Sequence, residues 1–410
     1  MATQHFMIVG AGLAGAKAAE ALRGQGFDGR VTLIGDEQYR PYERPPLSKD
    51  YLAGKADRDT VFVHTEKWYA DNDIDLRLGV AVAGIDRSSS RVRLADGASD
   101  GYDRLLLATG ARPRRLPVPG ADATGVHHLR ALPDSDALKE VIANAARLVV
   151  IGAGWIGLEV TAAARTNGVA VTVVESAELP LLRVLGPEVA PVFAQLHREH
   201  GVDLRFGVQL TEITTADGVA TGVRLADGSH IPADAVLVAV GVEPNTGLAW
   251  DADLDVHNGI VVDDSLATSD PHIFAAGDVA NAFHPVLSRH IRVEHWANAL
   301  NQPATAATAM RSGKASYREL PYFYTDQYDL GMEFTGFVEP GEYDRVVFRG
   351  NVEAREFVAF WLKDQRVLAG MNVNVWDVVD PINTLIRSGG AVDPVRLADP
   401  RHPLDELGVE

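Results

Sequence analysis

Two stretches of this sequence repeat one order of features: a short apolar run, three glycines, an alanine-rich segment, a second apolar run and an acid. They begin at Phe6 and at Leu148. The glycines are Gly10, Gly12 and Gly15 in the first copy and Gly152, Gly154 and Gly157 in the second. Their G-x-G-x-x-G spacing allows a tight turn, close approach of the backbone to a pyrophosphate, and close packing of a helix on a strand. Each stretch therefore predicts a Rossmann-type dinucleotide-binding unit.

The apolar runs predict buried parallel strands, because they are too short for helices and rich in β-forming residues. They are Phe6–Val9 and Val31–Ile34 in the first copy, and Leu148–Ile151 and Val171–Val174 in the second. The helix between each pair directs its N-terminal N–H groups and the positive end of its dipole at phosphates. Two such units in one chain predict electron transfer between two dinucleotides, a nicotinamide and a flavin.

An acid follows the last strand of each copy, where a carboxylate can bind a ribose diol. These acids are Asp36 and Glu175. The charge of Glu175 would repel a 2′-phosphate, and no arginine occurs between Glu175 and Leu182. The sequence therefore predicts NADH rather than NADPH. Arg183 follows closely, and it stays open whether it would receive a 2′-phosphate or meet the other phosphates of the cofactor.

The sequence contains no cysteine. Disulfide reductases with two dinucleotide sites need a redox-active cysteine pair, and their peroxide-reducing relatives need one reactive cysteine, so both activities are excluded. An iron–sulfur cluster ligated by cysteines of this chain is excluded as well. Electrons must therefore pass from the flavin directly to an acceptor outside the polypeptide.

The formal net charge of −18 argues against nucleic acid as a partner. An acidic partner would have to dock on a local basic patch, although surface solvation is the ordinary role of any single arginine. The candidates are Arg112, Arg114 and Arg115, and the group Arg289, Arg292, Arg311, Lys314 and Arg318. The thirteen histidines show no spacing typical of metal ligands, so no metal is expected.

No stretch is long and apolar enough for a transmembrane helix, and the first strand begins too close to Met1 for a signal peptide. We therefore expect no membrane insertion and a cytoplasmic protein. The residues 112–120 contain three prolines and predict a crossover linker, and a second crossover is expected after the strand Ala235–Val240.

From about Pro321 the pattern predicts a small α+β domain of antiparallel strands. The expected strands are Tyr322–Tyr324, Arg345–Phe348, Phe357–Leu362 and Val367–Asn374, followed by a helix at Val375–Ile386. Glycines end that helix, and the proline-containing tail after Asp393 is expected to be irregular.

Four further positions each allow two interpretations. The prolines of residues 39–49 exclude helix until about Ser48, a candidate N-cap, and Lys49 by itself would be an ordinary surface lysine. Glu159 is expected in the first turn of its helix, either near the nicotinamide or stabilising the helix dipole. Asp278 follows a buried strand and either binds a sugar-like chain or caps a helix. The helix near Trp296 would direct its positive end at a flavin, or Trp296 is simply core.

Eight motifs together resemble the FAD-dependent, NADH-using ferredoxin reductases that serve haem monooxygenases and aromatic dioxygenases, the putidaredoxin reductase type. They are IVGAGLAG (8–15), ERPPLSK (43–49), LLLATGARPR (105–114), VVIGAGWIGLE (149–159), AVGVEPN (239–245), TSDPHIFAAGDV (268–279), VEHWANA (293–299) and TDQYDLG (325–331). The chain is also similar to apoptosis-inducing factor. The resemblance covers nearly the whole chain.

The resemblance implies an α/β, glutathione-reductase-like fold with two Rossmann-type domains and a C-terminal α+β domain. The FAD-binding domain would be discontinuous, at residues 1–115 and 248–318. The NAD-binding domain would span 116–247 and the C-terminal reductase domain 319–410.

The resemblance also assigns residues. It places Asp36, Arg44, Lys49, Val82, Arg130, Asp278 and Trp296 on FAD, Glu175 on the NADH ribose and Glu294 beside the nicotinamide. The motifs add further expected FAD-binding residues, which are Gly10, Gly12, Leu13, Ala14, Gly15, Ala108, Thr109, Gly110 and Gly277. They also add expected NADH-binding residues, which are Gly152, Gly154, Ile156, Gly157, Arg183 and Gly241. Lys49 and Glu159 would pair beside the isoalloxazine and tune it. Tyr324 stands where relatives often have a tryptophan over the nicotinamide–flavin stack; stacking should survive, while the stability of the complex of reduced flavin with NAD⁺ stays open.

The resulting hypothesis is an enzyme that accepts a hydride from NADH at FAD and passes electrons singly to a [2Fe–2S] ferredoxin. One alternative keeps the flavin but changes the acceptor to rubredoxin, quinone or oxygen. A second alternative is a redox-dependent binding protein like apoptosis-inducing factor. Fast NADH consumption without a protein acceptor would favour the first, and slow reoxidation with an NADH-induced change of oligomeric state the second.

Overall fold

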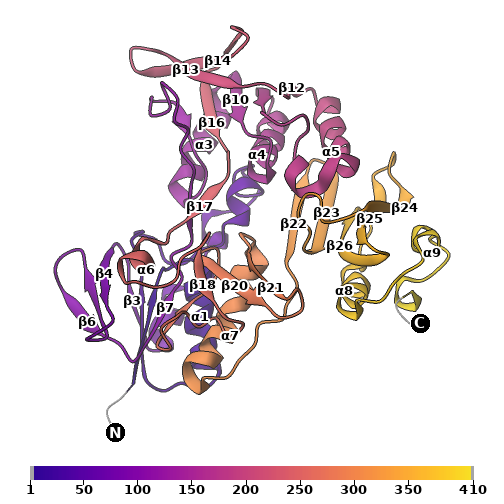
Figure 1. The fold of residues 1–410 in the computed structure, drawn as a ribbon. Helices are drawn as coiled ribbons and strands as arrows, with labels where there is room; N and C mark the ends of the chain where they lie inside the picture. Colours follow the sequence, from indigo (N-terminus) through magenta and orange to yellow (C-terminus); the bar gives the residue numbers. More distant parts are fainter. Residues whose placement is uncertain (1–3, 408–410) are drawn as a thin grey trace. The chain divides into compact units, whose positions relative to one another are not determined.

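The computed structural model describes residues 4–407 of the chain, which Figure 1 traces from the N-terminus to the C-terminus. It divides into two compact units. The first unit contains the residues up to Glu43, Arg58–Arg112 and Glu243–Pro321, and the second contains Arg44–Asp57, Pro113–Val242 and the residues from Tyr322 onward. The three-domain division with its boundaries stays a prediction.

The first unit is built on a five-stranded parallel sheet in the order β19-β7-β1-β2-β3. Its strands are β1 (His5–Val9), β2 (Arg30–Ile34), β3 (Ile74–Arg77), β7 (Arg104–Leu107) and β19 (Ile273–Ala275). Helix α1 (Leu13–Gly24) packs against α7 (Trp296–Ser312), and small side chains such as Ala18 and Ala306 are fully buried there. Alanines permit this close approach, as the alanine-rich pattern after the first glycines predicts.

Smaller elements complete the first unit. Two three-stranded sheets contain β4 (Val82–Asp86), β5 (Arg91–Leu94) and β6 (Ser99–Gly101), and β18 (Ile260–Val262), β20 (Ala280–His284) and β21 (Arg289–Arg292). The short helices are η2 (Arg58–Val61), α2 (Glu66–Asp71) and α6 (Gly247–Asp251). The strands β8 (Ala111–Pro113) and β17 (Val242–Pro244) pair where the chain leaves this unit and returns to it.

The second unit contains a similar five-stranded parallel sheet in the order β12-β11-β10-β16-β9, but its edge strand β9 precedes the other four strands in the sequence, whereas β19 follows the other four in the first sheet. The strands are β9 (Val126–His127), β10 (Arg147–Ile151), β11 (Ala170–Val174), β12 (Asp203–Arg205) and β16 (Ala235–Val238). Its helices are η1 (Pro45–Ser48), α3 (Leu132–Asn144), α4 (Trp155–Thr166) and α5 (Leu182–Glu199), and a side sheet contains β13 (Leu210–Ala216), β14 (Val219–Leu225) and β15 (His230–Pro232). Both copies of the glycine pattern therefore lie between a central strand and a helix, as the sequence predicts.

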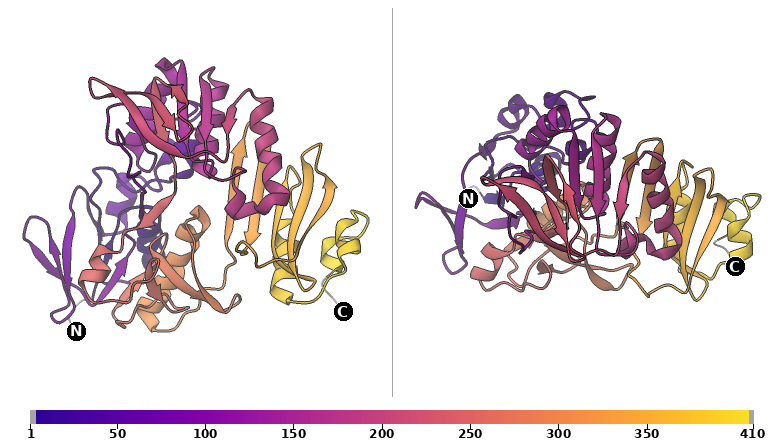
Figure 2. Two further views of the ribbon diagram at one scale, coloured as in Figure 1. Left: turned by 45° about the horizontal axis from the view of Figure 1, so that its top comes forward. Right: turned by 90° about the horizontal axis from the view of Figure 1, so that it is seen from above.

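The C-terminal part of this unit is an antiparallel sheet in the order β22-β23-β26-β25-β24. Its elements are β22 (Tyr322–Gln327), β23 (Leu330–Gly336), β24 (Arg345–Asn351), β25 (Glu356–Lys363), β26 (Arg366–Val373), α8 (Val379–Ser388), α9 (Pro394–Ala398) and η3 (Leu404–Glu406). Both views of Figure 2 place α5 beside this sheet, where Tyr343 donates a hydrogen bond to Glu188 at 2.9 Å. The α/β class with a C-terminal α+β part is confirmed.

Three local expectations are wrong. Strand β23 is absent from the sequence-based assignment, and α8 begins at Val379 rather than at Val375. The tail is not irregular throughout, because Asp393 caps α9 by accepting from the Val395 N–H at 2.9 Å and Pro394 occupies the first helical turn. An Asp-Pro pair is a helix-start signal, so the sequence contained the information.

Candidate functional site

The first glycine of each glycine turn leaves no room for a side chain. A Cβ at Gly10 would lie 2.1 Å from the Ala108 carbonyl oxygen, and a Cβ at Gly152 would lie 2.4 Å from that of Ala239. Both glycines also have positive φ, +116° and +102°. No other residue type fits either position, so each strand-to-helix turn requires its glycine.

The middle glycine of each turn, in contrast, faces open space. A Cβ at Gly12 or at Gly154 would meet no heavy atom within 4 Å. These two glycines are also the N-caps of α1 and α4, and neither helix has a side-chain cap. The first N–H groups of both helices therefore remain available to an anion, and both turns fit a dinucleotide pyrophosphate.

The acids after the second strands differ in their surroundings. Asp36 is exposed directly after β2. The Glu175 carboxylate is held at the second glycine turn, where it accepts from the Ala153 N–H at 2.8 Å and the Ala177 N–H at 2.9 Å. The start of α5 reaches the same turn, because the Leu181 N–H donates to the Ala153 carbonyl at 3.0 Å. Exposed Arg183 follows on the first turn of α5.

Other motif residues of the first unit assemble around its glycine turn. Gly277 lies against Ala14, since a Cβ added at Gly277 would lie 3.0 Å from the Ala14 Cβ. Thr109 and Asn245 exchange two hydrogen bonds of 2.8 Å each. The indole N–H of Trp296, the first residue of α7, donates to Glu43 at 3.2 Å. Leu13 is the first residue of α1, Ala108 and Gly110 follow β7, and Val82 begins β4.

Glu294 has an unexpected partner. The Arg292 guanidinium lies 2.5 Å from the Glu294 carboxylate and also donates to the Asp278 carbonyl at 3.2 Å and the Asn258 side chain at 3.2 Å. Its side chain is only 7% exposed. The expectation that Arg292 belongs to a surface patch is therefore wrong, because its charge is engaged within the first unit.

The second unit contains a buried charged centre around Glu159, whose residue is 7% exposed. The ammonium group of Lys49 donates to one carboxylate oxygen, Oε1, which also accepts from the Thr325 hydroxyl at 2.6 Å. The other oxygen, Oε2, accepts from the Ser48 hydroxyl at 2.5 Å. Three donors on one carboxylate match its ionised form.

Two expectations about this centre are wrong. Glu159 is the fifth residue of α4, so it lies outside the first helical turn and its partner is Lys49 rather than the helix dipole. Ser48 is not an N-cap, because Pro45 and Pro46 open the short helix η1 and Ser48 closes it. Prolines are accepted in a first turn, where their missing N–H groups have no partner anyway.

Strand β22 divides its side chains between two faces. Phe323, Thr325 and Gln327 are buried on one face, and the partly buried Tyr324 belongs to the opposite face. The Tyr324 ring centroid lies 5.5 Å from the Lys49 nitrogen. The motif TDQ thus supplies inward polar groups, and its period of two was the signal that could have identified Thr325 and Gln327 from the sequence.

The remaining candidates fall in the second unit or at its boundary. Arg44 donates to the Arg130 carbonyl, so these two FAD candidates lie together with Lys49 in the second unit rather than with Asp36. Ile156 is 37% exposed in the first turn of α4. The Gly241 carbonyl accepts from the Arg114 N–H at 2.9 Å.

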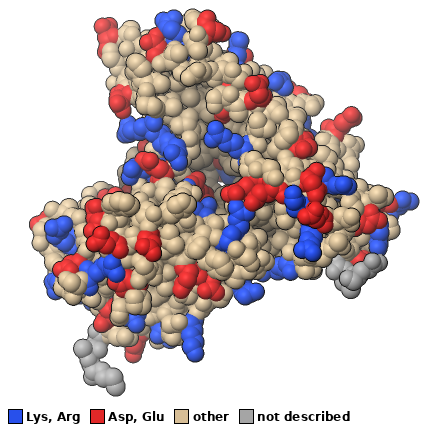
Figure 3. Space-filling model, viewed as in Figure 1, with Lys and Arg blue, Asp and Glu red and all other residues tan. Residues whose placement is uncertain are grey.

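The basic run near residue 112 is partly neutralised. Arg112 pairs with Glu243 at 2.8 Å and Arg115 pairs with Asp122 at 2.9 Å. Arg114 is exposed. Figure 3 shows Lys and Arg interspersed with Asp and Glu over the visible face, without a broad basic field. On this face, electrostatic docking would therefore be local.

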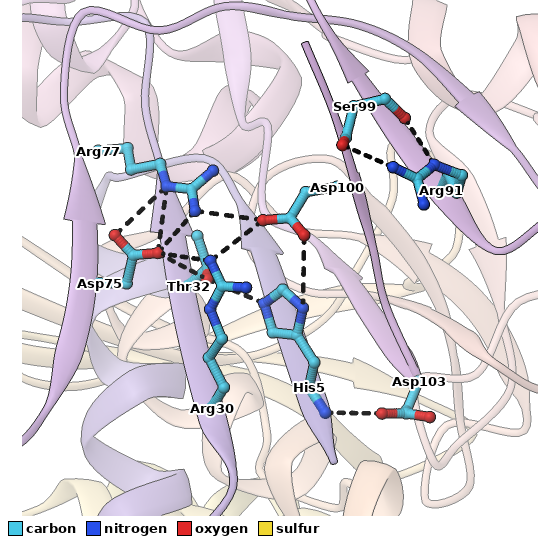
Figure 4. Close-up of polar contacts among 9 residues, drawn as sticks. All are labelled: His5, Arg30, Thr32, Asp75, Arg77, Arg91, Ser99, Asp100 and Asp103. Atoms are coloured by element: carbon cyan, nitrogen blue, oxygen red, sulfur yellow. Dashed lines mark hydrogen bonds and ion pairs between the residues drawn. The ribbon is translucent and has the colours of Figure 1, made fainter. Parts of the chain in front are cut away.

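A second charged cluster lies in the first unit, where β6 meets the parallel sheet (Figure 4). Arg30 and Arg77 each bind both Asp75 and Asp100, at 2.7–3.2 Å. Burial raises the pKa of Asp75, but hydrogen bonds from Arg77 and Arg30 outweigh it and hold that pKa below its ordinary value. Burial, with the charge of Arg30, lowers the pKa of His5. This cluster lies outside the glycine turns and ties β6 to the sheet.

Comparison with known proteins decides the family. The Pyridine nucleotide-disulphide oxidoreductase family matches residues 4–313, and the Reductase C-terminal family matches residues 322–408. This chain belongs to the pyridine nucleotide-disulphide oxidoreductase family. It is thus related to oxidoreductases, although the absence of cysteine separates it from those members that use a disulfide.

Three known proteins are especially similar. The chain is 43% identical to rhodocoxin reductase of Rhodococcus erythropolis over 90% of this chain and 86% of that protein. It is 41% identical to the anthranilate 1,2-dioxygenase system ferredoxin–NAD(+) reductase component of Burkholderia cepacia over 98% of each chain. The solved covalent putidaredoxin reductase–putidaredoxin complex contains a chain of 39% identity, with a TM-score of 0.93, covering 99% of this chain and 98% of that one. The resemblance inferred from the motifs is confirmed.

Two features are absent from the part of the chain that the structure describes. None of the helices between residues 4 and 407 is long and apolar enough to cross a membrane. Within the same range, no group of three His, Asp or Glu side chains could hold a metal ion.

Proposed function

We propose that this protein transfers electrons from NADH through FAD to a [2Fe–2S] ferredoxin that supplies an oxygenase. The observation that carries the proposal is the pair of matched glycine turns, each open at its middle glycine, together with the buried ion pair of Lys49 and Glu159. The relatives add support, since their names describe ferredoxin–NAD(+) and redoxin reductases. With no cysteine in the chain, an external acceptor is required.

FAD would be held at the first glycine turn and NADH at the second. We assign the FAD diphosphate to Gly12 and the N-terminus of α1, its ribose to Asp36, and its ribityl chain to Asp278. Arg44, Val82, Thr109, Arg130 and Trp296 are the further FAD candidates. The flavin, when bound, supplies hydride acceptance and single-electron release.

The NADH ribose is assigned to Glu175, whose carboxylate the Ala153 and Ala177 N–H groups already orient. Gly154 leaves room for the pyrophosphate. Arg183 is the candidate side chain to bind this group. Glu294 is the candidate for the nicotinamide, oriented by Arg292. Lys49 and Glu159 take no proton in this scheme: Lys49 places a positive charge near the flavin and Glu159 moderates it. Tyr324 is the candidate for stacking.

The ferredoxin is proposed to be acidic and to dock on local basic groups. Arg114 is the candidate of the first run. The candidates of the second group are Arg311 in the last turn of α7 and Lys314 and Arg318 after this helix, and all four side chains are exposed. Charge complementarity would raise the association rate in spite of the net charge of −18.

Anaerobic stopped flow tests the proposal. We expect NADH, and not NADPH, to bleach the yellow protein rapidly, and a [2Fe–2S] ferredoxin then to be reduced at catalytic rates. Fast NADH consumption in air without ferredoxin would instead favour oxygen as acceptor. A long-lived bleached complex that ferredoxin does not reoxidise would contradict the reductase assignment.

A further inference from the structure

A chain of buried polar side chains leads away from Glu159 through the second unit. Thr325 donates to Glu159 at 2.6 Å, and Gln327 Nε2 donates to the Thr325 hydroxyl oxygen at 3.2 Å. Gln327 Oε1 lies 2.8 Å from His197 Nε2, and the Tyr328 hydroxyl lies 3.4 Å from His197 Nδ1. The chain therefore joins α4, β22 and α5.

The donors of this chain all point toward Glu159. Gln327 Nε2 can only donate, so the Thr325 oxygen accepts from it and the Thr325 proton is directed at the carboxylate. Gln327 Oε1 can only accept, so His197 carries its proton on Nε2. The other ring nitrogen, Nδ1, then accepts from Tyr328. Burial lowers the pKa of His197 to about 4, which keeps the ring neutral as this pattern requires.

The side chains of this hydrogen-bonded chain are buried, and burial fixes their orientations. Thr325 and His197 are 0% exposed and Gln327 is 1% exposed. A buried donor or acceptor without a partner is costly, so each member fixes the orientation of the next. The outcome is a single orientation for the Thr325 proton, set by a histidine two side chains away from it.

The hydrogen-bonded chain can orient the Glu159 carboxylate, but it cannot conduct a proton. An amide accepts on oxygen and donates from nitrogen, so a proton received at Gln327 Oε1 does not leave from Nε2. The donors also point inward, whereas release of a proton from the centre would require them to point outward.

We propose that His197, Gln327 and Thr325 are positioning residues that hold the Glu159 carboxylate against Lys49. The inference rests on the proposed function in one respect, namely that Lys49 acts on the bound flavin. Without the Thr325 donor, Glu159 would keep only Ser48 and Lys49, and its carboxylate could rotate away from the geometry that moderates the Lys49 charge.

The first test compares Thr325→Val with Thr325→Ser in the FAD-loaded protein. Valine keeps the volume and removes the donor, whereas serine retains a hydroxyl. We expect Thr325→Val to lower the limiting rate of flavin reduction at saturating NADH by about tenfold, with the half-saturating NADH concentration unchanged. The midpoint potential of the bound FAD should shift in the same variant. Thr325→Ser should keep both the reduction rate and the potential near their wild-type values.

Thr335→Val is the matched control. Thr335 lies on the neighbouring strand β23, is 1% exposed and donates to Asn383 at 2.6 Å, but it is not part of the chain to Glu159. It should lose comparable stability and keep the wild-type rate and potential. Equal slowing in both valine variants, or no slowing in Thr325→Val, would overturn the inference.

A second test measures the hydrogen bonds of His197 directly and needs no turnover. The ¹⁵N spectrum of histidine-labelled protein should show His197 neutral, with its proton on Nε2, from pH 6 to 8. Gln327→Met should move the His197 Nε2 signal, whereas Thr335→Val should not. A proton on Nδ1 would contradict the proposed direction of the chain. If NADH fails to reduce the wild-type flavin, the proposed function fails, and this spectrum still tests the chain by itself.

Discussion

Lys49 and Glu159 show how much one residue depends on another in the same buried centre. Their side chains are only 12% and 7% exposed, so neither charge is well solvated without the other. Glu175, in contrast, accepts from two backbone N–H groups, that of Ala177 next to it and that of Ala153 in the glycine turn. Glu159 therefore depends on distant side chains, whereas Glu175 depends on the backbone of its own Rossmann-type unit.

Lys49→Ala is expected to destabilise the protein by about 3–5 kcal/mol, because it leaves a buried carboxylate without its counter-charge. The double variant Lys49→Ala/Glu159→Gln should recover part of this loss. Denaturant unfolding measures both. Lys49→Ala should also slow flavin reduction and shift the flavin potential; an unchanged hydride-transfer rate in stopped flow would rule out that role.

Glu175→Ala is expected to raise the ratio of NADPH to NADH activity by about tenfold, because it removes the charge that repels a 2′-phosphate. Steady-state kcat/KM with both cofactors measures the ratio. Glu178→Ala is the control, since Glu178 is an exposed acid three residues further along. A ratio that rises equally in both variants would indicate a general charge effect.

At the scale of elements, short strands are secured by side chains rather than by length. Strand β6 has only three residues, and Arg30 and Arg77 of the parallel sheet bind its Asp100. At the other end of the chain, the Arg349 guanidinium donates to the carbonyls of Leu397, Asp399, Pro400 and His402 and so fixes the segment after α9.

The cluster at β6 predicts a loss of stability in acid. The folded-state pKa of His5 lies below its ordinary 6.5, so the unfolded chain binds the proton first. Stability is therefore full above pH 6.5 and falls as the pH drops through the folded pKa, and the lowered pKa of Asp75 extends the loss to lower pH. Urea unfolding at several pH values measures this. His5→Gln should reduce the upper part of the dependence without abolishing it, because burial also lowers the pKa of other histidines, such as His197. An identical pH profile in that variant would disprove the contribution of His5.

At the scale of the whole molecule, net charge and local charge act against each other. The chain carries a formal charge of −18, so an acidic ferredoxin is repelled at long range and can be attracted only by exposed basic groups. Arg292, which the sequence placed among them, is engaged inside the first unit. In the run near residue 112, Arg112 and Arg115 form ion pairs with Glu243 and Asp122. Arg114 lies between them and is exposed.

We expect Arg114→Glu to reduce kcat/KM for ferredoxin by about tenfold at low salt, and the difference from wild type to shrink as salt screens the charges. Ferredoxin-dependent cytochrome reduction measures it. Arg115→Glu should have a smaller effect, because Asp122 already partners that guanidinium. A salt-independent loss would indicate a structural defect rather than docking.

The two Rossmann-type units can be predicted from the sequence, because strand, glycine turn, helix and acid lie within about thirty residues and each step depends on neighbours. The strand β23 and the start of α8 were not predicted from the sequence, because turn geometry and packing set their limits. The environment of Glu159, in contrast, arises from tertiary contacts. Its partners Lys49, Ser48 and Thr325 are 110, 111 and 166 residues away, and no local pattern encodes such distances. Folding alone brings those donors onto one buried carboxylate, where desolvation makes each of them necessary.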